Sequence, residues 1–515
     1  MGLSFYLVVA GFLVSLTLSS GESRRESPML GQNVIFASVK YNPKNYDGEM
    51  SDEDKGRRNK VYEMMKHAWD NFTRDVWGKV DDPSRVYYSF HLSTIELGTI
   101  IIGAMDTLYI MGMNTEFEEG REWISKNFTL EGVNTPISVS ETTSLLIGGL
   151  LSCFALTGDT MFRDKAQHVA DKLLPAFSTP SGLPYSYINP STGSTANNDW
   201  TKNKSILTEV GSLFPEFAYL SDLTGKPIYR NKVEQIRTTL KEAYKPDSLY
   251  TILIDPMTGK IERCNDTVFP GDGTSLEAYA DSFYEFLWRT WLINKENQIE
   301  SRQIFDEAIS PIIGKMLKVF QGITYDEYYC DVKIESTAEI AQKMDQLACF
   351  SGGLFALASA TLETRTQRYM DLAKILTDTC RESYYKIDQR FQEIEDEVSE
   401  STEIPYVLSS ETIGSYFILW RSTKDQKYRE WGWEELQAIE KNCPKDDYYA
   451  VVRNVCSLNL AKYDIQRGYF LSETLKYLYL LFSDDKLISQ KDWVFNTGGH
   501  PLPIKGSRFY RSANK

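Results

Sequence analysis

The fold prediction rests on the pattern in the stretch GGLLSCFALTGDTMFRDKAQHVADKLL, residues 148–174. It contains an apolar helical run, a turn of Thr, Gly and Asp, an aromatic residue followed by Arg, and an amphipathic helical run. The pattern returns as PEFAYLSDLTGKPIYRNKVEQIRTTL at residues 215–240 and as GSYFILWRSTKDQKYREWGWEELQAI at residues 414–439. Weaker copies lie between them, at residues 294–309 and 360–375. This repeat predicts an array of helical hairpins.

The turns of the three strong copies begin at Thr157, Thr224 and Thr423. The first two are 67 residues apart, and the next gap of 199 residues is close to three such units. An array of this kind either opens into a solenoid or closes into a ring. The first helix of each copy is apolar nearly all round, which is typical of a buried inner helix, whereas the second is amphipathic. We therefore expect an all-α fold, a closed barrel of α/α hairpins.

Composition excludes one class of partner. The 515 residues are 42% hydrophobic, which is ample for a large core. The formal net charge is −15, and no cluster of Lys and Arg stands out. Nucleic-acid binding is therefore not expected.

The N-terminus predicts entry into the secretory pathway. The apolar run from Leu3 to Leu18 is short for a membrane span and ends in small residues, so we expect a cleaved signal peptide. No Lys or Arg precedes the run, so an uncleaved anchor is the alternative. No later run is long enough to span a bilayer. The predicted division is a signal peptide (1–21), an N-terminal extension (22–54), one α/α-barrel domain (55–505) and a C-terminal tail (506–515).

Secretory entry gives meaning to the sequons and the cysteines. Four sequons are expected to carry surface glycans: Asn71, Asn127, Asn203 and Asn265. Seven cysteines leave at least one unpaired within the chain. Because no CxxC pair exists and only four histidines occur, a zinc site is not expected.

Acidic residues stand where the predicted inner helices begin: Glu141, Glu209, Glu216, Asp281, Glu285, Glu411 and Glu473. Taken singly, each is an ordinary helix-capping acid that complements the helix dipole. In a closed barrel, however, these starts could converge on one rim, where a ring of carboxylates is costly unless it is used or paired. A carboxylate pocket with few histidines suits hydrolysis of a glycosidic bond or the binding of Ca²⁺.

Six phrases carry a resemblance to a known family: MDTLYIMGM, GGLLSCFALTGD, ADSFYEFL, KYREWGWEELQAIEKNC, ETLKYLYLLFSD and VFNTGGHPLPI. From residue 67 to residue 504 the chain resembles the class I α-1,2-mannosidases, glycoside hydrolase family 47. The resemblance implies a seven-hairpin α/α toroid. It also implies Ca²⁺-dependent, inverting removal of α-1,2-linked mannose from high-mannose N-glycans of glycoproteins. The expected place is the secretory lumen, in the endoplasmic reticulum or Golgi, or outside the cell.

The resemblance also implies roles for single residues. Glu141 matches the general acid, and Asp281 and Glu411 are both candidates for the base that activates water. Thr497 matches the residue that binds Ca²⁺ through its hydroxyl and carbonyl. The substrate-binding matches are Glu209, Glu216, Glu285, Tyr469 and Glu473. A disulfide between Cys349 and Cys380 is expected as well.

Several pocket positions depart from the family pattern. The departing residues are Gly103, Leu145, Tyr279, Gln346, Ser409, Ser410, Gly414, Gly498 and Gly499. The family usually carries Arg at three of them and acids at three others, so charge of both signs is lost. Loss of arginine should weaken substrate placement and raise the pKa of neighbouring acids. The alternative function is therefore a catalytically impaired mannose-glycan-binding homologue in glycoprotein quality control or endoplasmic-reticulum-associated degradation. A helical scaffold for protein partners ranks last.

Overall fold

The computed structural model describes residues 41–513 with gaps, all within one compact unit, residues 37–515. The gaps are residues 44–49, 76, 78–85, 89–97, 244, 246–247, 262–280, 314–316, 321–326, 331–348, 363–365, 394–405, 407, 454–460 and 464. The predicted signal peptide, Asn265, Tyr279 and Gln346 lie outside the described residues. The backbone of Asp281 is described, but its side chain is not.

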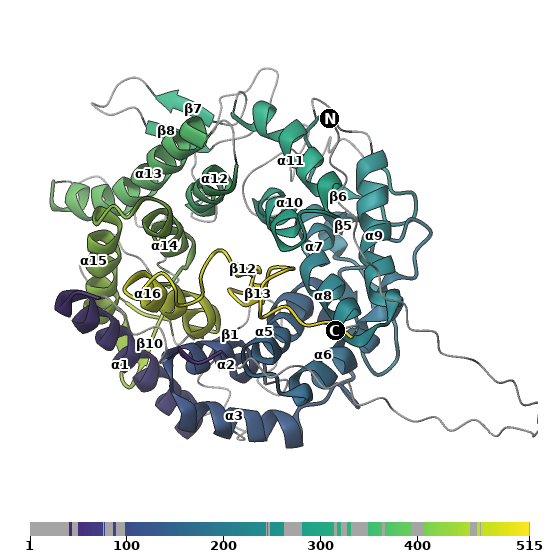
Figure 1. Ribbon diagram of the computed structural model, residues 1–515, viewed down its shortest axis with the longest axis horizontal. Helices are drawn as coiled ribbons and strands as arrows, with labels where there is room; N and C mark the ends of the chain where they lie inside the picture. The colour runs from purple at the N-terminus through teal and green to yellow at the C-terminus, as the bar shows by residue number, and fades with distance from the viewer. Residues whose placement is uncertain are drawn as a thin grey trace, which may run out of the picture. The chain divides into compact units, whose positions relative to one another are not determined.

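The apolar helices of the repeat form an inner ring (Figure 1). Among the described residues these are α2 (Thr99–Met111), α5 (Gly148–Thr157), α8 (Phe214–Thr224), α10 (Asp281–Ile293), α12 (Phe350–Thr361), α14 (Glu411–Thr423) and α16 (Leu475–Leu481). Each contacts the next, and α16 contacts α2, so the ring closes. The apolar composition explains their position: α5 is buried at every residue from Gly148 to Leu156.

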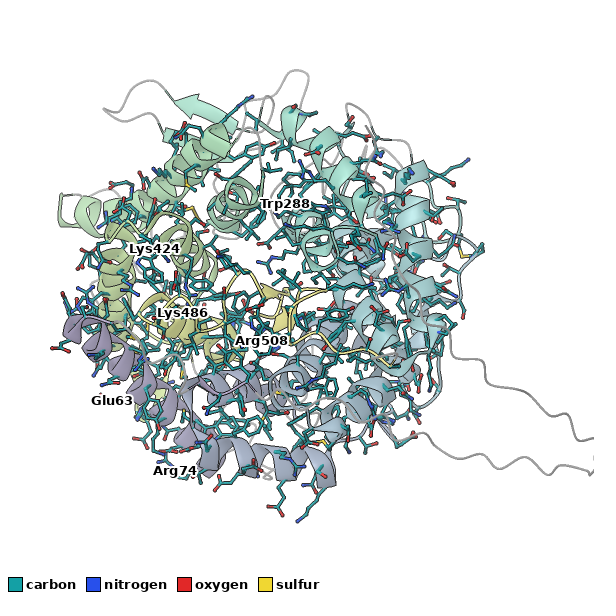
Figure 2. The ribbon with its side chains drawn as sticks, viewed as in Figure 1. Glu63, Arg74, Trp288, Lys424, Lys486 and Arg508 are labelled. Atoms are coloured by element: carbon teal, nitrogen blue, oxygen red, sulfur yellow. A yellow bond between two sulfur atoms is a disulfide. The ribbon has the colours of Figure 1, made fainter. Side chains whose placement is uncertain are left out.

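An outer helix covers each inner one (Figure 1). The outer helices in the described part of the chain are α3 (Asn114–Asn127), α6 (Thr160–Leu173), α9 (Pro227–Glu242), α11 (Ile299–Pro311), α13 (Thr366–Glu393), α15 (Lys427–Asn442) and α1 (Asp52–Asp75). The first helix of the chain, α1, covers the last inner helix, α16. Trp288 of α10 is buried between the layers and packs on Phe305 of α11, with ring centroids 4.8 Å apart (Figure 2). The predicted seven-hairpin α/α barrel is confirmed.

The threonines of the repeat end the inner helices. The hydroxyls of Thr157, Thr224 and Thr423 each donate to the carbonyl four residues earlier, at 2.7–2.8 Å. The residue that follows each threonine is left-handed: Gly158 (φ 78°), Gly225 (φ 68°) and Lys424 (φ 60°). Such a residue is a common C-terminal cap, and it turns the chain sharply into the outer helix.

Short strands, which the all-α prediction lacks, connect the hairpins. They pair as β1 (Val86–Tyr88) with β11 (Ile465–Arg467), β2 (Ile137–Ser138) with β3 (Tyr187–Ile188) and β4 (Thr195–Ala196), β5 (Ser205–Ile206) with β6 (Leu253–Ile254), β7 (Leu317–Phe320) with β8 (Glu327–Cys330), β9 (Pro444–Lys445) with β10 (Tyr448–Tyr449), and β12 (Trp493–Phe495) with β13 (Pro501–Pro503). Among the strands that the structure describes, β1 and β11 alone pair in parallel. The β12–β13 hairpin lies inside the ring (Figure 1) and contacts α5 and α10. Its turn is the NTGGH segment, Asn496–His500.

The expected disulfide is present. Cys349 and Cys380 are bonded, with Cα atoms 5.9 Å apart, and the bond ties the start of α12 to α13. Cys153 and Cys443 are free and buried.

One sequon is not at the surface. Asn71 is 3% exposed, and its amide nitrogen donates to the carbonyl of His67 at 2.9 Å. The expectation of a surface glycan at Asn71 is therefore wrong for this fold, because the amide nitrogen is enclosed within α1. Asn127 and Asn203 are exposed.

The expected C-terminal tail packs on the barrel. Phe509 and Arg511 are buried, and the Arg511 guanidinium donates to the carbonyl of Phe154 at 2.7 Å. One helical stretch, residues 139–157, has the length and hydropathy of a membrane span, but 78% of that window is buried inside the protein. That stretch includes α5 and so belongs to the inner ring.

Candidate active site

Two inner helices begin with a π-helical turn. Short α4 (Val139–Glu141) runs into η3 (Thr142–Ile147) before α5, and η9 (Phe470–Thr474) precedes α16. Glu141 stands just before the first π-turn, and Glu473 lies inside the second. The wider turn changes which backbone groups pair within the helix, and such turns are frequent at functional sites.

The turn between β12 and β13 docks on the first of these π-turns. The side-chain nitrogen of Asn496 donates to the Ser144 carbonyl at 2.8 Å and to Oε1 of Glu216 at 2.7 Å. Its side-chain oxygen accepts from the backbone N–H of His500 at 2.8 Å. A Cβ atom at Gly148 would collide with the Asn496 amide, so a glycine is needed there for this approach.

Two buried cations hold the carbonyls of the turn. Arg289 Nη1 donates to the carbonyls of Phe495 and Asn496, at 2.6 and 2.8 Å. Lys476 Nζ donates to the carbonyl of Gly499 at 2.6 Å. Thr497 lies between these anchors and is exposed, whereas Asn496 and Gly498 are buried.

Each of these cations has an acidic partner. Arg289 Nη2 bonds Glu285 Oε1 at 2.5 Å. Lys476 Nζ lies 2.8 Å from Asp106, whose other oxygen lies 2.8 Å from His500 Nδ1. Burial alone would raise the pKa of Asp106, but the charge of Lys476 and the interactions with His500 and Lys476 outweigh it and lower that pKa to about 2.

Thr497 lines a pocket of about 100 Å³, together with three acids: Glu285, Glu411 and Glu473. Arg289 also lines it. The pocket is therefore built from α10, α12, α14, η9 and α16 together with the β12–β13 turn. Four of the predicted site residues meet here.

The pocket environment raises the pKa of two of its acids, Glu473 and Glu285. Burial, together with the negative charge of Glu411, raises the pKa of Glu473 to about 8, although Ser410 Oγ donates to Glu473 at 2.8 Å. Burial also raises the pKa of Glu285, against the opposing effect of Arg289. Ser409 Oγ donates to Glu411. Burial and Glu411 raise the pKa of the Tyr469 hydroxyl. Glu473 therefore keeps its proton at neutral pH.

Glu216 lies behind the turn. It is fully buried, and burial raises its pKa to about 7, although the bond from Asn496 acts in the opposite direction. Within the described part of the chain, its second oxygen, Oε2, has no hydrogen-bond partner. Such an unsatisfied buried oxygen is costly, which makes it a natural acceptor for a bound water or ion.

Glu141 and Glu209 form a second group beside Tyr187. Both acids are half-buried, and Glu209 accepts a hydrogen bond from Ser186 Oγ at 2.5 Å. Burial raises the pKa of the Tyr187 hydroxyl, and the charges of Glu209 and Glu141 raise it further, so the three groups are near one another. The first π-turn, which follows Glu141, joins this group to the turn of Thr497 through the Ser144–Asn496 bond.

Two of the departing residues are neighbours. A Cβ atom at Gly498 would lie 3.0 Å from Cδ2 of Leu145. The apolar side chain at 145 and the absence of a side chain at 498 therefore fit one another beside Thr497. A Cβ atom at Gly414 would lie at ordinary contact distance, 3.5 Å, from the Tyr477 ring.

Sequence reasoning missed Arg289, Asn496 and Lys476. Arg289 follows Glu285 by four residues in an otherwise apolar helix, a spacing that predicts an ion pair on one helix face. Lys476 likewise stands inside an apolar run. For Asn496 no local signal exists, because its partners are far away in the sequence.

The donors present suit a hard cation. Thr497 offers a hydroxyl and a carbonyl, and the pocket acids offer further oxygens, the ligand type that Ca²⁺ prefers. Among the described residues, no group of three or more His, Cys, Asp or Glu side chains converges tightly enough to hold a metal by itself. An ion here would therefore use Thr497 together with oxygens from water or substrate.

Comparison with known proteins places the chain in a family. The glycosyl hydrolase family 47 model matches residues 64–504. A mannosyl-oligosaccharide α-1,2-mannosidase IA of Drosophila melanogaster is 46% identical over 472 residues, 89% of this chain and 69% of that protein. A human mannosyl-oligosaccharide 1,2-α-mannosidase IB is 38% identical over 475 residues, 89% of this chain and 71% of that protein.

A solved structure supports the same fold. The α-1,2-mannosidase from Trichoderma reesei superposes with a TM-score of 0.74 at 22% identity, over 88% of this chain and 99% of that one. At 22% identity this likeness supports the fold alone, whereas the family match identifies the class of enzyme. The chain is therefore a glycoside hydrolase that belongs to glycosyl hydrolase family 47.

Proposed function

We propose that this protein removes α-1,2-linked mannose from high-mannose N-glycans by Ca²⁺-dependent hydrolysis with inversion. One observation carries the proposal: Glu285, Glu411 and Glu473 open on a single pocket with Thr497. Paired carboxylates are what glycosidic-bond hydrolysis requires. The relatives named above are α-1,2-mannosidases. The setting would be the lumen of the endoplasmic reticulum or Golgi, or the cell exterior.

In the proposed reaction Glu141 gives a proton to the leaving-group oxygen, directly or through water. Glu411 or Asp281 takes a proton from the attacking water as the new C1–O bond forms on the opposite face. Roughly 6.5–9.5 Å between acid and base would leave room for that water. Glu473, protonated at neutral pH, can donate a hydrogen bond to a sugar oxygen.

Ca²⁺ would be held by the hydroxyl and carbonyl of Thr497. Bound there, it would supply positive charge that orients sugar hydroxyls. Tyr469 would pack on the sugar ring, and Glu209, Glu216 and Glu285 would complete substrate binding. The exposed Asn127 and Asn203 sequons suit a lumenal protein.

The test is hydrolysis of a Man₉ N-glycan by the secreted chain with Ca²⁺, beside a Glu141→Gln variant. We expect mannose release by the wild type and a fall of about 10²–10⁴-fold in the variant. Proton NMR of the first product should show the β-anomer, because inversion converts an α-linkage into β-mannose. Release of the α-anomer first would contradict the inverting mechanism.

The alternative, a mannose-glycan-binding homologue with little turnover, rests on the uncharged contacts of the pocket. Leu145 meets Gly498, and Ser409 and Ser410 stand beside Glu411 and Glu473. These residues give a bound sugar fewer charged partners than arginines would. Ca²⁺-dependent glycan binding without mannose release would favour this alternative over the enzyme.

A further inference from the structure

The Thr497 turn is fixed from two sides by buried cations, and the two anchors differ. Lys476 acts after Thr497, on the carbonyl of Gly499. Arg289 acts before it, on two successive carbonyls, those of Phe495 and Asn496. Only Arg289 also lines the pocket on which Thr497 opens. One side chain therefore holds both carbonyls that precede Thr497.

We propose that Arg289 is a positioning residue that holds Thr497 where its hydroxyl and carbonyl can bind a cation. The identity of that cation as Ca²⁺ rests on the proposed function. The role of Arg289 in holding the turn rests on the hydrogen bonds alone. With both preceding carbonyls bound to one guanidinium, rotation of the Phe495–Asn496–Thr497 backbone would break two hydrogen bonds at once.

The guanidinium is needed for its shape. Arg289 makes three hydrogen bonds, two to carbonyls and one to the Glu285 carboxylate, from a plane with fixed donor directions. A lysine ammonium is a compact point charge on a flexible stem and cannot reproduce that fork. The side chains of Arg289 and Glu285 are 9% and 10% exposed, so the ion pair is shielded from water. Glu285 thereby neutralises the cation and fixes its orientation.

The experiment compares Arg289→Lys with a matched variant elsewhere in the full-length protein. Arg421 is also a buried arginine, and its Nη2 donates to the carbonyls of Leu480, Asp484 and Leu487, which do not line the pocket. Arg421→Lys therefore makes the same chemical change away from Thr497. Two quantities are measured: hydrogen–deuterium exchange of the peptide covering residues 495–503, and the Kd for Ca²⁺ by calorimetry.

The turn offers amides that report its order. The backbone N–H groups of Asn496, Gly499 and His500 all donate hydrogen bonds within the turn. In Arg289→Lys we expect their exchange to speed up about tenfold, since local opening sets the exchange rate. The Kd for Ca²⁺ should rise about 10–100-fold, as for other residues that orient a ligand. Arg421→Lys should leave both quantities at their wild-type values.

Two results would overturn the proposal. One is that hydrogen–deuterium exchange at residues 495–503 is the same in Arg289→Lys as in the wild type. The other is that this exchange speeds up by the same factor in Arg289→Lys and Arg421→Lys. If Arg289→Lys does not fold, Glu285→Gln serves instead, because it removes the charge that orients the guanidinium; faster exchange at the same peptide is expected. If the wild type binds no Ca²⁺ and releases no mannose, the proposed function fails. The exchange comparison still decides the role of Arg289.

Discussion

At the scale of the residue, Glu216 makes the stability of the metal-free protein depend on pH. Its pKa is about 7 in the folded protein and near 4.5 in the unfolded chain, so the folded state holds the extra proton between these values. The contribution of Glu216 to stability should therefore fall by about 2.5 kcal/mol as pH rises from 5 to 8. Glu216→Gln keeps an acceptor for Asn496 and should remove that fall. Urea unfolding in a chelator, at both pH values, measures it.

The surface variant Glu118→Gln is the control for Glu216→Gln. Glu118 is exposed, so its charge is solvated in both states and its loss should leave the pH dependence of unfolding unchanged. If Glu216→Gln shows the same fall in stability as the wild type, the buried carboxyl is not protonated at neutral pH. Added Ca²⁺ should lessen the wild-type fall, because a nearby cation favours the ionised carboxylate.

At the scale of the element, the turns of the hairpins depend on a left-handed residue. Gly225 ends α8 at φ 68°, and a Cβ atom there would meet Ala513 only at ordinary contact distance, so conformation alone opposes a side chain. Gly225→Ala should cost about 1 kcal/mol. Gly56 is exposed in the second turn of α1, with open space around it, so Gly56→Ala should raise the free energy of unfolding by about 0.5–1 kcal/mol. Denaturant midpoints of the two variants that shift in the same direction would contradict the argument.

The elements also show how far a sequence can be interpreted. The hairpins and their threonine turns are local chemistry, so the repeat of polar and apolar residues predicts them. Strands of two to four residues are too short to show an alternating pattern, and they form because the barrel brings their segments together. The two π-turns look like α-helix in sequence. Asn71 lies in a glycosylation motif, but such a motif does not indicate whether its asparagine is buried in the folded protein.

The site divides in the same way. The acids at the starts of inner helices were found because an acid at the start of an apolar helix is visible locally. The role of Arg289 is not visible locally, because it depends on carbonyls that lie 206 residues or more further along the chain. Closure of the ring is what places those carbonyls beside α10.

At the scale of the whole molecule, we expect closure of the ring to depend on a buried ion pair that joins α1, the outer helix over α16, to α15 of the preceding hairpin. Arg429 of α15 binds Asp54 of α1 at 2.6 Å, with side chains 7% and 5% exposed. The same guanidinium donates to the carbonyls of Leu481 and Ser483, so it joins three segments. Asp54→Asn removes the carboxylate and leaves the positive charge of Arg429 buried without that partner. The free energy of unfolding, measured in urea, should fall by about 3 kcal/mol.

Asp52→Asn is the matched change on the same helix. Asp52 pairs with Lys55 at 3.0 Å, but its side chain is 99% exposed, so the loss should be below about 1 kcal/mol. Combining Asp54→Asn with Arg429→Met should recover part of the stability, because the double variant no longer buries an unpaired charge. Equal unfolding midpoints for Asp54→Asn and Asp52→Asn would mean that packing of α1 on α16, rather than this ion pair, closes the barrel.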